Sequence, residues 1–329
     1  MMPSSMTHTY FGMDVYEELS AKSKKLIDSK VEYFKLFCQG SDPFMFYHFL
    51  LGKKAKEMTE IQEKMHQEKT QKFFLNTIQY IHEHKLQNDA EAMTYLYGYI
   101  CHYYLDLYAH PYLYYKSGIF RKRNKNTYKY NGLHQQIEYA IDLYFISKRE
   151  TDNPAKFKIH HGIFGNASFS SPLKDLINYS IGTTYSIDNS VNKYWSSIQY
   201  MKKFFYIANY DPYGIKLKFY KLIDKFKPKR IVKFEELSFY NRYDEVDDYL
   251  NLERHKWCYP WDKRKVFTSS FLDLYEVALK DAVSTIKDVT NILDNKILDL
   301  KRIKQLFPNL SYVTGKPCYQ KLEMKYFEF

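Results

Sequence analysis

Cysteine is scarce in this chain of 329 residues, and long apolar runs are missing from it. The four cysteines stand apart, without a CxxC pair, so the sequence favours neither a disulfide framework nor a thiolate metal site. They are Cys38, Cys101, Cys258 and Cys318. No run approaches the roughly 18 apolar residues of a spanning helix, and residues 1–12 lack the apolar stretch of a secretory signal. We therefore expect a cytoplasmic protein.

The charge of the chain is unbalanced, with a net charge of +11 and basic residues gathered in 116–130 and 221–234. Such segments can attract phosphate-bearing partners. However, the chain is rich in Lys, Asn, Ile and Tyr throughout, with 34 Tyr against 11 Gly, so compositional bias explains the charge more simply than a nucleic-acid surface does. A composition of 45% hydrophobic and 26% charged residues argues against a disordered chain.

Helical periodicity dominates the sequence, because apolar residues recur at intervals of three and four. In the first half this pattern predicts helices over 14–37, 58–84, 90–110 and 132–149. Breaks fall at 40–43, 86–89 and 131–132, and 151–172 reads as a long irregular connection. Further helices are predicted over 173–182, 188–209, 213–226 and 269–305. We find no internal repeat and no alternating stretch long enough for a sheet, so we predict an all-α fold.

Two of these predicted helices each carry a histidine and a carboxylate four residues apart. His102 precedes Asp106, and His134 precedes Glu138, with Asp142 continuing the second stripe. Residues four apart on an α-helix lie about 40° round and roughly 6 Å along, so each pair points the same way and can share one cation. A carboxylate inside an apolar interior is costly unless it is paired or bound to a cation. The pattern therefore predicts metal binding.

His110 indicates a second ion. It follows His102 by eight residues, which is about 80° of rotation and roughly 12 Å of rise, too far for both to bind one metal. Pro111 comes next, and the residue before a proline is disfavoured in helical geometry, so we expect the helix to end or kink there and turn His110 towards a second centre. Paired metals are typical of enzymes that split phosphate esters.

Three further residues are candidate ligands: His8 in "SMTHTYFG", Asp42 in "GSDPF" and His66 in "EKMHQEK". Taken singly, each has an ordinary explanation as a helix cap, a turn residue or a surface histidine. Imidazole and carboxylate without thiolate suit zinc, with Mn²⁺ or Fe²⁺ as alternatives. Asp42, Asp106 and Glu138 supply three negative charges, fewer than the positive charge of two divalent ions, and the surplus is typical of a catalytic site that binds an anionic phosphate.

The ordered series resembles the ligand series of the zinc-dependent phospholipases C, which share their fold with single-strand zinc nucleases. The series is His8, Asp42, His66, His102-Tyr103-x-x-Asp106, His110 and His134-x-x-x-Glu138. The resemblance covers about 3–150, and 249–260 and 268–278 resemble the family's C-terminal helices more weakly. It implies one all-α domain over 1–329, with a metal-binding core in 1–150 and completing helices and a substrate wall in 151–329.

The resemblance also implies how the ligands are shared. The first zinc would be held by residues like Asp42, His66, His102 and Asp106, and the second by residues like His110, His134 and Glu138. Asp42 would in addition bridge the two ions or take a proton from the attacking water.

The chain departs from the secreted members of this family at its third zinc. Those members bind a third ion through an N-terminal Trp, the first His and the shared Asp, which correspond here to His8 and Asp106. This chain has no Trp near its start, and its interval from Asp106 to His110 is shorter by two residues. It resembles instead an intracellular-looking bacterial branch, so two zinc ions are implied and a third is left open.

Three functions follow from these observations. The leading one is a zinc-dependent phosphodiester hydrolase, in which zinc-activated water attacks a phospholipid or related phosphodiester. The second is a single-strand nuclease of the same fold, suggested by the basic segments and by aromatic residues that could stack on bases. The third is a non-catalytic, metal-stabilised helical protein that binds a partner or a membrane surface. Residues 151–260 carry no motif that we can interpret.

Overall fold

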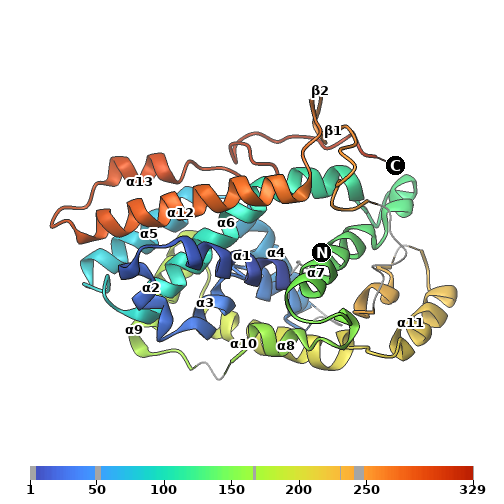
Figure 1. The fold of residues 1–329 in the computed structure, drawn as a ribbon, viewed down its shortest axis with the longest axis horizontal. Helices are drawn as coiled ribbons and strands as arrows, with labels where there is room; N and C mark the ends of the chain where they lie inside the picture. Colours follow the sequence, from blue (N-terminus) through green and yellow to red (C-terminus); the bar gives the residue numbers. More distant parts are fainter. Residues whose placement is uncertain (1–4, 49–52, 166–167, 230, 241–247, 329) are drawn as a thin grey trace.

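Helices make up most of the chain in the computed structural model, which describes residues 5–48, 53–165, 168–229, 231–240 and 248–328 (Figure 1). The prediction of an all-α fold is confirmed. The α-helices are α1 (Ser5–Glu18), α2 (Ala21–Asp28), α3 (Val31–Phe37), α4 (Lys53–Gln67), α5 (Thr70–Glu83), α6 (Ala90–Ser117), α7 (Leu133–Arg149), α8 (Ile159–Ile163), α9 (Ser171–Ile177), α10 (Ser190–Lys203), α11 (Ile215–Phe226), α12 (Phe271–Asp294) and α13 (Leu300–Leu306).

Shorter helical segments connect these elements. The 3₁₀ segments are η1 (Asp42–Phe46), η2 (Lys125–Tyr130), η3 (Pro154–Lys156) and η6 (Phe234–Leu237). Two π-helical turns, η4 (Asn178–Thr183) and η5 (Phe204–Asn209), continue α9 and α10. The helix predicted over 14–37 is divided among α1, α2 and α3, and the helix predicted over 58–84 is divided between α4 and α5. The second break falls at Lys69, whose φ of 54° cannot continue a helix.

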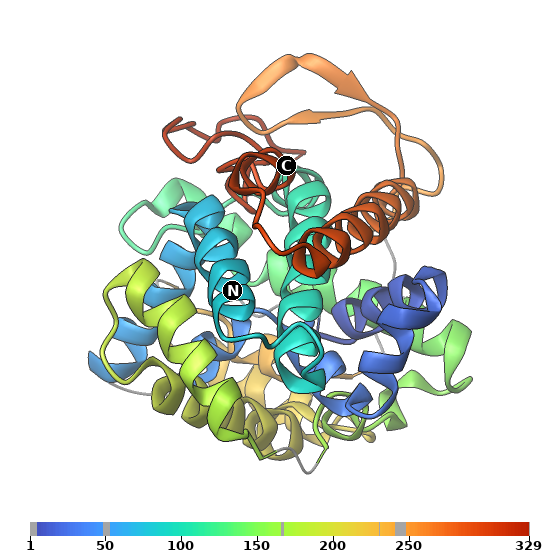
Figure 2. The ribbon, with the colours of Figure 1, turned by 90° about the vertical axis from the view of Figure 1, so that its left-hand side faces the viewer.

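Helix α6 forms the centre of the molecule and is buried along almost its whole length (Figures 1 and 2). Its apolar residues occur on every side, as expected for a helix that is surrounded by others. Helix α12 packs along it, and α1, α3 and α7 contact it as well. The Asp89 side chain accepts a hydrogen bond from Ala92 N and begins the helix. Residues on α6 therefore lie in the interior of the protein.

Helix α6 does not end at His110, as one form of the prediction had it, because the helix continues through Pro111 to Ser117. A proline inside a helix removes one backbone hydrogen bond, here the one to the carbonyl of Leu107. Tyr112 and Leu113, just beyond the proline, are buried, so packing favours continued helix despite that loss. The Leu107 carbonyl is approached closely by Gly315, where an added Cβ would lie only 3.0 Å from it.

A two-stranded antiparallel sheet replaces one segment that resembled a helix. Strand β1 (Trp257–Tyr259) pairs with β2 (Asp262–Phe267), so the expectation of a C-terminal helix over 249–260 is wrong. The segment 268–278 does enter a helix, α12, which begins after Ser270 with a reciprocal capping box to Asp273. The irregular connection over 151–172 contains η3 and α8.

The described part of the chain contains no helix that is both long and apolar enough to span a bilayer. Helix α6 has the length, with 28 residues, but Asp106 and two histidines interrupt its apolar surface. Because His102 and Asp106 are buried inside the protein, they belong to an internal site.

The segment that follows α13 crosses the outer side of α6 and brings distant residues together. Tyr312 N donates a hydrogen bond to the carbonyl of His66 over 2.8 Å, and Glu328 N donates to the carbonyl of Tyr115 over 2.9 Å. Lys325 N also donates to the carbonyl of Pro260 in the β1–β2 turn. These contacts fix the segment against the end of α6 that carries His110.

Candidate metal centre

All eight candidate ligands lie close together in the structure. Helix α6 carries His102, Asp106 and His110, and α7 carries His134 and Glu138. The other three come from separate elements: His8 from α1, Asp42 from the first residue of η1, and His66 from the last turn of α4. Seven of the eight are buried, and His110 is partly buried. Residues from five segments therefore meet in the interior.

The first group is centred on the carboxylate of Asp106. Its Oδ2 lies 3.1 Å from His66 Nε2 and 3.3 Å from His102 Nε2, and the two imidazole nitrogens are 3.4 Å apart. Asp42 Oδ1 lies 3.3 Å from the same nitrogen of His66. Zinc–nitrogen bonds of about 2.05 Å in a tetrahedron put neighbouring ligand atoms roughly 3.3 Å apart. His66, His102 and Asp106 are therefore spaced as the ligands of one zinc ion would be, and Asp42 lies beside them against His66.

The second group comprises His110, His134 and Glu138, whose ligand atoms lie within 4.8 Å of one another. His134 Nε2 is 3.2 Å from Glu138 Oε1. Within the described residues, the buried Oε2 of Glu138 has no hydrogen-bond partner. His110 thus groups with α7 rather than with His102, as the helical spacing predicts. The continuous helix is sufficient for this, since it carries His110 about two turns beyond His102.

His8 lies beside the first group. Its Nε2 is 3.2 Å from Asp106 Oδ1, and it can also share an ion with Asp42 and His102. Helix α1 is held in this position by Asp142, which accepts hydrogen bonds from Met6 N at 3.2 Å and Thr7 N at 2.7 Å. A carboxylate at a helix N-terminus is stabilised by the free N–H groups there. Asp142 therefore positions His8 and is not among the candidate ligands of the second stripe.

Four residues that sequence reasoning missed hold the histidines in place. Ser41 Oγ and the carbonyl of Gln62 lie 3.1 and 3.0 Å from His66 Nδ1, which leaves Nε2 directed at the carboxylates. Ser117 Oγ lies 3.0 Å from His134 Nδ1, and the carbonyl of Tyr312 lies 3.1 Å from His110 Nδ1. Such outer contacts set the orientation of metal-binding imidazoles. Gln62 could have been found from its spacing of four before His66, whereas nothing in the sequence marks Tyr312.

The pKa values of several side chains in the site are strongly shifted from their ordinary values. Burial lowers the pKa of His66, but the carboxylates of Asp106 and Asp42 outweigh it and raise that pKa to about 10. Burial acts to raise the pKa of Asp106, yet the surrounding imidazoles hold it well below its usual range. Burial lowers the pKa of His102 to about 4. It also raises the pKa of Glu138 well above the ordinary range of a glutamate. Without a cation, His66 and Asp106 therefore stabilise each other's charged forms, whereas burial disfavours the charged forms of His102 and Glu138.

The donor set fits zinc. It consists of imidazole nitrogens and carboxylate oxygens, which zinc accepts, and the free cysteines are elsewhere in the fold. Buried polar atoms normally have hydrogen-bond partners, but within the described residues His8 Nδ1, His102 Nδ1 and Glu138 Oε2 have none. A bound cation would compensate the buried acids, which are expensive to desolvate alone. We therefore take both groups as candidate zinc sites.

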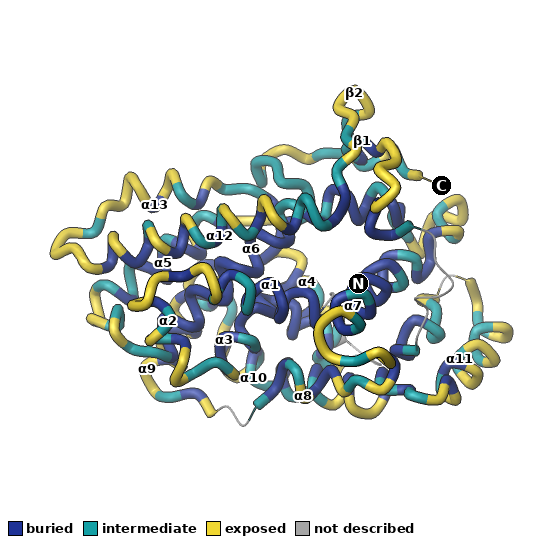
Figure 3. Tube along the Cα trace, in the orientation of Figure 1, coloured by how far each residue is buried: buried dark blue, intermediate teal, exposed yellow. Residues whose placement is uncertain are grey.

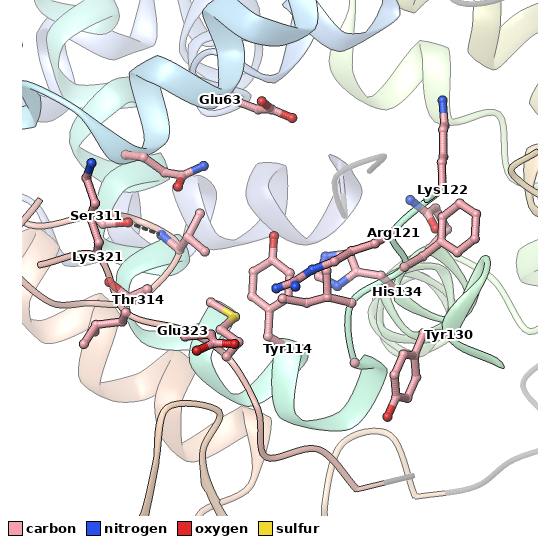
Figure 4. A pocket seen from close by; sticks show the side chains of 18 of the residues that line it. Glu63, Tyr114, Arg121, Lys122, Tyr130, His134, Ser311, Thr314, Lys321 and Glu323 are labelled. Carbon is pink, nitrogen blue, oxygen red and sulfur yellow. Dashed lines mark hydrogen bonds between the residues drawn. The ribbon is translucent and has the colours of Figure 1, made fainter. Parts of the chain in front are cut away.

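A cavity of about 840 Å³ opens beside the second group (Figure 4). His134 and Tyr114 line both this cavity and a small pocket that also reaches Asp42, His66, His110 and Glu138. The walls of the cavity come from segments far apart in the sequence, chiefly 118–122, 130–135 and 311–324. Arg121 and Lys122 supply positive charge at the wall, and Glu63 and Glu323 supply negative charge. The second group thus borders the cavity through His134, and the small pocket lies between the cavity and the other ligands that it touches.

Comparison with known proteins identifies one family. The family model described as "Zinc dependent phospholipase C" matches residues 7–192, a stretch that contains all eight candidate ligands. No curated protein and no solved structure matches the chain. The cavity wall formed by 311–324 lies outside the matched stretch.

Proposed function

The chain belongs to the zinc-dependent phospholipase C family, and from this premise we propose that it is a zinc-dependent phosphodiester hydrolase acting on a phospholipid head group. The observation that carries the proposal is the convergence of three buried carboxylates and five histidines beside an open cavity. Structural zinc sites are usually closed by their protein ligands, whereas catalytic sites keep a position open. Contact between the second group and the cavity supports a catalytic site.

We assign two zinc ions to these residues. The first would be held by Asp42, His66, His102 and Asp106, and the second by His110, His134 and Glu138. When bound, zinc would polarise a phosphoryl oxygen and lower the pKa of water. His8 lies near enough to Asp106 to join a third ion, which this proposal leaves open.

Asp42 is the residue that we propose as proton acceptor. Hydrolysis forms a bond from water oxygen to phosphorus and breaks a phosphorus–oxygen bond to the leaving alcohol, so one water proton needs an acceptor. Asp42 lines the pocket that touches both groups, and nearby imidazoles hold its pKa below the usual range against the effect of burial. Gln62 Nε2 donates a hydrogen bond to its Oδ1 over 3.1 Å and fixes its orientation.

The cavity walls suggest how a phosphodiester would be bound. Arg121 and Lys122 are exposed and can attract its negative charge from solution. Tyr114 is buried, and its ring centroid lies 4.9 Å from that of His134, so it forms an apolar wall next to the second group. A head group held between these residues would place its phosphate beside His134.

The nuclease alternative receives less support from the structure. It depends on aromatic side chains that could stack on bases, yet seven of the nine tyrosines of α6 are buried. Stacking platforms for single strands must be accessible. Tyr95, Tyr97, Tyr99, Tyr103 and Tyr112 have less than 2% of their surface exposed.

The test combines metal analysis with an ester panel. We expect purified protein to retain zinc and to cleave a chromogenic phosphocholine ester faster than single-stranded DNA. His102→Ala should lose zinc and slow turnover by on the order of 100-fold or more. His160→Ala is the matched control, because His160 is also buried but lies outside the candidate groups, and it should keep both properties.

Two results would contradict the proposal in different ways. Protein that binds no zinc even when zinc is supplied would remove the metal site. Protein that is fully loaded with zinc but cleaves no phosphoester would support a metal-stabilised binding protein instead. In that case His102→Ala should unfold, because a structural metal contributes directly to folding.

A further inference from the structure

Helix α11 (Ile215–Phe226) presents an apolar stripe to solvent. Ile215, Phe219, Leu222 and Phe226 are 68%, 59%, 51% and 84% exposed. At 100° per residue these four lie within about 60° of one another around the helix. An apolar stripe on a helix of a folded protein normally faces the core. Figure 3 shows α11 at the edge of the molecule, with exposed residues along its outer side.

This orientation is fixed by contacts on the inner side of α11. Leu217 is buried, and its N–H donates a hydrogen bond to Asp211 Oδ2 over 2.7 Å. Tyr220 donates its hydroxyl to the carbonyl of Ala208 over 3.1 Å. Asp224 accepts from the first two N–H groups of η6, each over 2.9 Å. These contacts anchor the inner face of the helix, and they therefore hold its apolar stripe towards solvent.

Three lysines flank the stripe on one side. Lys218, Lys221 and Lys225 are exposed, and among the described residues none of them has a salt bridge. The only acidic residue of α11 is Asp224, which is turned inward. A helix with an apolar face bordered by unpaired cations matches the pattern of helices that lie in the interface of a bilayer. Its charge complements that of anionic lipid head groups.

The chain runs from α11 directly into the wall of the substrate cavity. Asn131 Nδ2 donates hydrogen bonds to the carbonyls of Lys229 and Ile231 over 3.2 and 2.8 Å. Asn131 and Val232 both line the cavity. The most exposed residue of the stripe, Phe226, is thus six positions from the cavity wall. A surface that contacts α11 would lie next to the region through which a head group must enter.

We propose that α11 is an interfacial helix that docks the protein on anionic phospholipid surfaces. Ile215, Phe219, Leu222 and Phe226 enter the boundary of the acyl region, and the three lysines lie among the head-group phosphates. The choice of a lipid surface over another protein rests in part on the proposed function. The helix itself lies outside the stretch matched by the family model, so the inference comes from this chain's own residues.

Vesicle co-sedimentation of the full chain tests the proposal without any turnover. We expect binding to mixed phosphatidylglycerol–phosphatidylcholine vesicles, and weaker binding to phosphatidylcholine alone. Phe219→Ser combined with Phe226→Ser should weaken binding on the order of 100-fold, because both rings lose their burial in lipid. Lys218→Gln, Lys221→Gln and Lys225→Gln together should weaken it roughly fivefold per lysine and reduce its salt dependence.

Ile297→Ser is the matched control. Ile297 is 85% exposed, nearly the same as Phe226, but it lies between α12 and α13. The control should bind vesicles as the unaltered protein does. Unchanged binding of the double phenylalanine variant, or equal loss in the control, would overturn the proposal. The proposal would also be overturned if the unaltered protein did not bind vesicles and the α11 substitutions lowered the molecular mass of its assembly in solution. The stripe would then join copies of the chain.

Hydrolysis of a soluble ester separates this proposal from the proposed function. The α11 variants should cleave a soluble chromogenic ester at the unaltered rate, because none of the substituted residues lines the cavity. Loss of cleavage together with retained folding in these variants would count against a purely interfacial role. If the protein binds vesicles but cleaves no ester, the docking proposal for α11 stands and the proposed hydrolase function is wrong.

Discussion

The imidazole of His66 should give zinc binding at the candidate site a measurable pH dependence. Burial lowers the pKa of His66, but Asp106 and Asp42 raise it to about 10, so in the metal-free protein the ring is protonated at neutral pH. Its Nδ1 faces the carbonyl of Gln62 at 3.0 Å and keeps a proton there. The other nitrogen, Nε2, must therefore lose its proton before it can bind an ion. We expect zinc binding to release that proton.

The size of the effect follows from the pKa. Each proton released on binding changes the binding free energy by about 1.4 kcal/mol per pH unit, as long as the group is protonated in the free protein. The range from about pH 6.5 to 8.5 lies below the raised pKa of His66, so the affinity for zinc should increase roughly 100-fold across it. Burial raises the pKa of Glu138 well above its usual range, and this group adds to the slope wherever it remains protonated.

Zinc affinity should increase with pH, whereas the stability of the metal-free protein should decrease with pH. A raised pKa of His66 contributes stability that is present below the ordinary value of 6.5 and is lost as the pH rises towards 10. Ionisation of the buried Glu138 destabilises the metal-free fold in the same direction. The difference in Tm between zinc-loaded and metal-free protein should therefore grow with pH.

Calorimetry with chelator-buffered zinc provides the assay. Titrations in buffers of different ionisation enthalpy give the number of protons released, and titrations at several pH values give the slope. His66→Gln should bind zinc more weakly and release about one proton fewer. An affinity that is the same at both ends of the range would show that His66 is not deprotonated by binding, and the assignment of its Nε2 as a ligand atom would fail.

Three further predictions concern single positions. Asp142→Asn weakens the hydrogen bonds that hold the start of α1. We expect denaturant titration to show a loss of roughly 2 kcal/mol in the unfolding free energy of the metal-free protein. Unchanged stability would contradict the role given to Asp142. Gly40→Ala places a Cβ against the His102 ring at a φ of +53°, so zinc content should fall while circular dichroism stays helical, and full zinc retention would count against it. Glu138→Gln removes an uncompensated buried acid, so at mildly alkaline pH the metal-free protein should gain about 1 to 3 kcal/mol of stability while zinc binds more weakly. Thermal unfolding with and without chelator checks this, and stabilisation of both forms would refute it.

Helical spacing was the most informative part of the sequence for the site. The spacing of four puts His102 and Asp106 on one face of α6, and their ligand atoms are 3.3 Å apart. The same holds for His134 and Glu138 on α7. Spacing within one helix cannot give the distance between helices, so the approach of His66 to Asp106 required the folded structure.

Local preferences failed where packing outweighs them. Pro111 disfavours helix at His110, but the buried residues on both sides keep α6 continuous. The hairpin at 257–267 was missed because the helix expected over 249–260 rested on a weak family resemblance, and the charged strand β2 gives no apolar alternation that would mark a sheet. Tyr312 was missed for a different reason, since it acts through its backbone carbonyl, which every residue type has.

The contact between His110 and the carbonyl of Tyr312 joins positions that are 202 residues apart in the chain. A ribosome that adds roughly 5 to 20 residues per second needs on the order of 10 to 40 s to travel between them. During that interval the histidines of α6 are already made, but the strand of chain that orients one of them does not yet exist. If His110 holds the second zinc as proposed, that site can take its final form only after the C-terminal segment has been made.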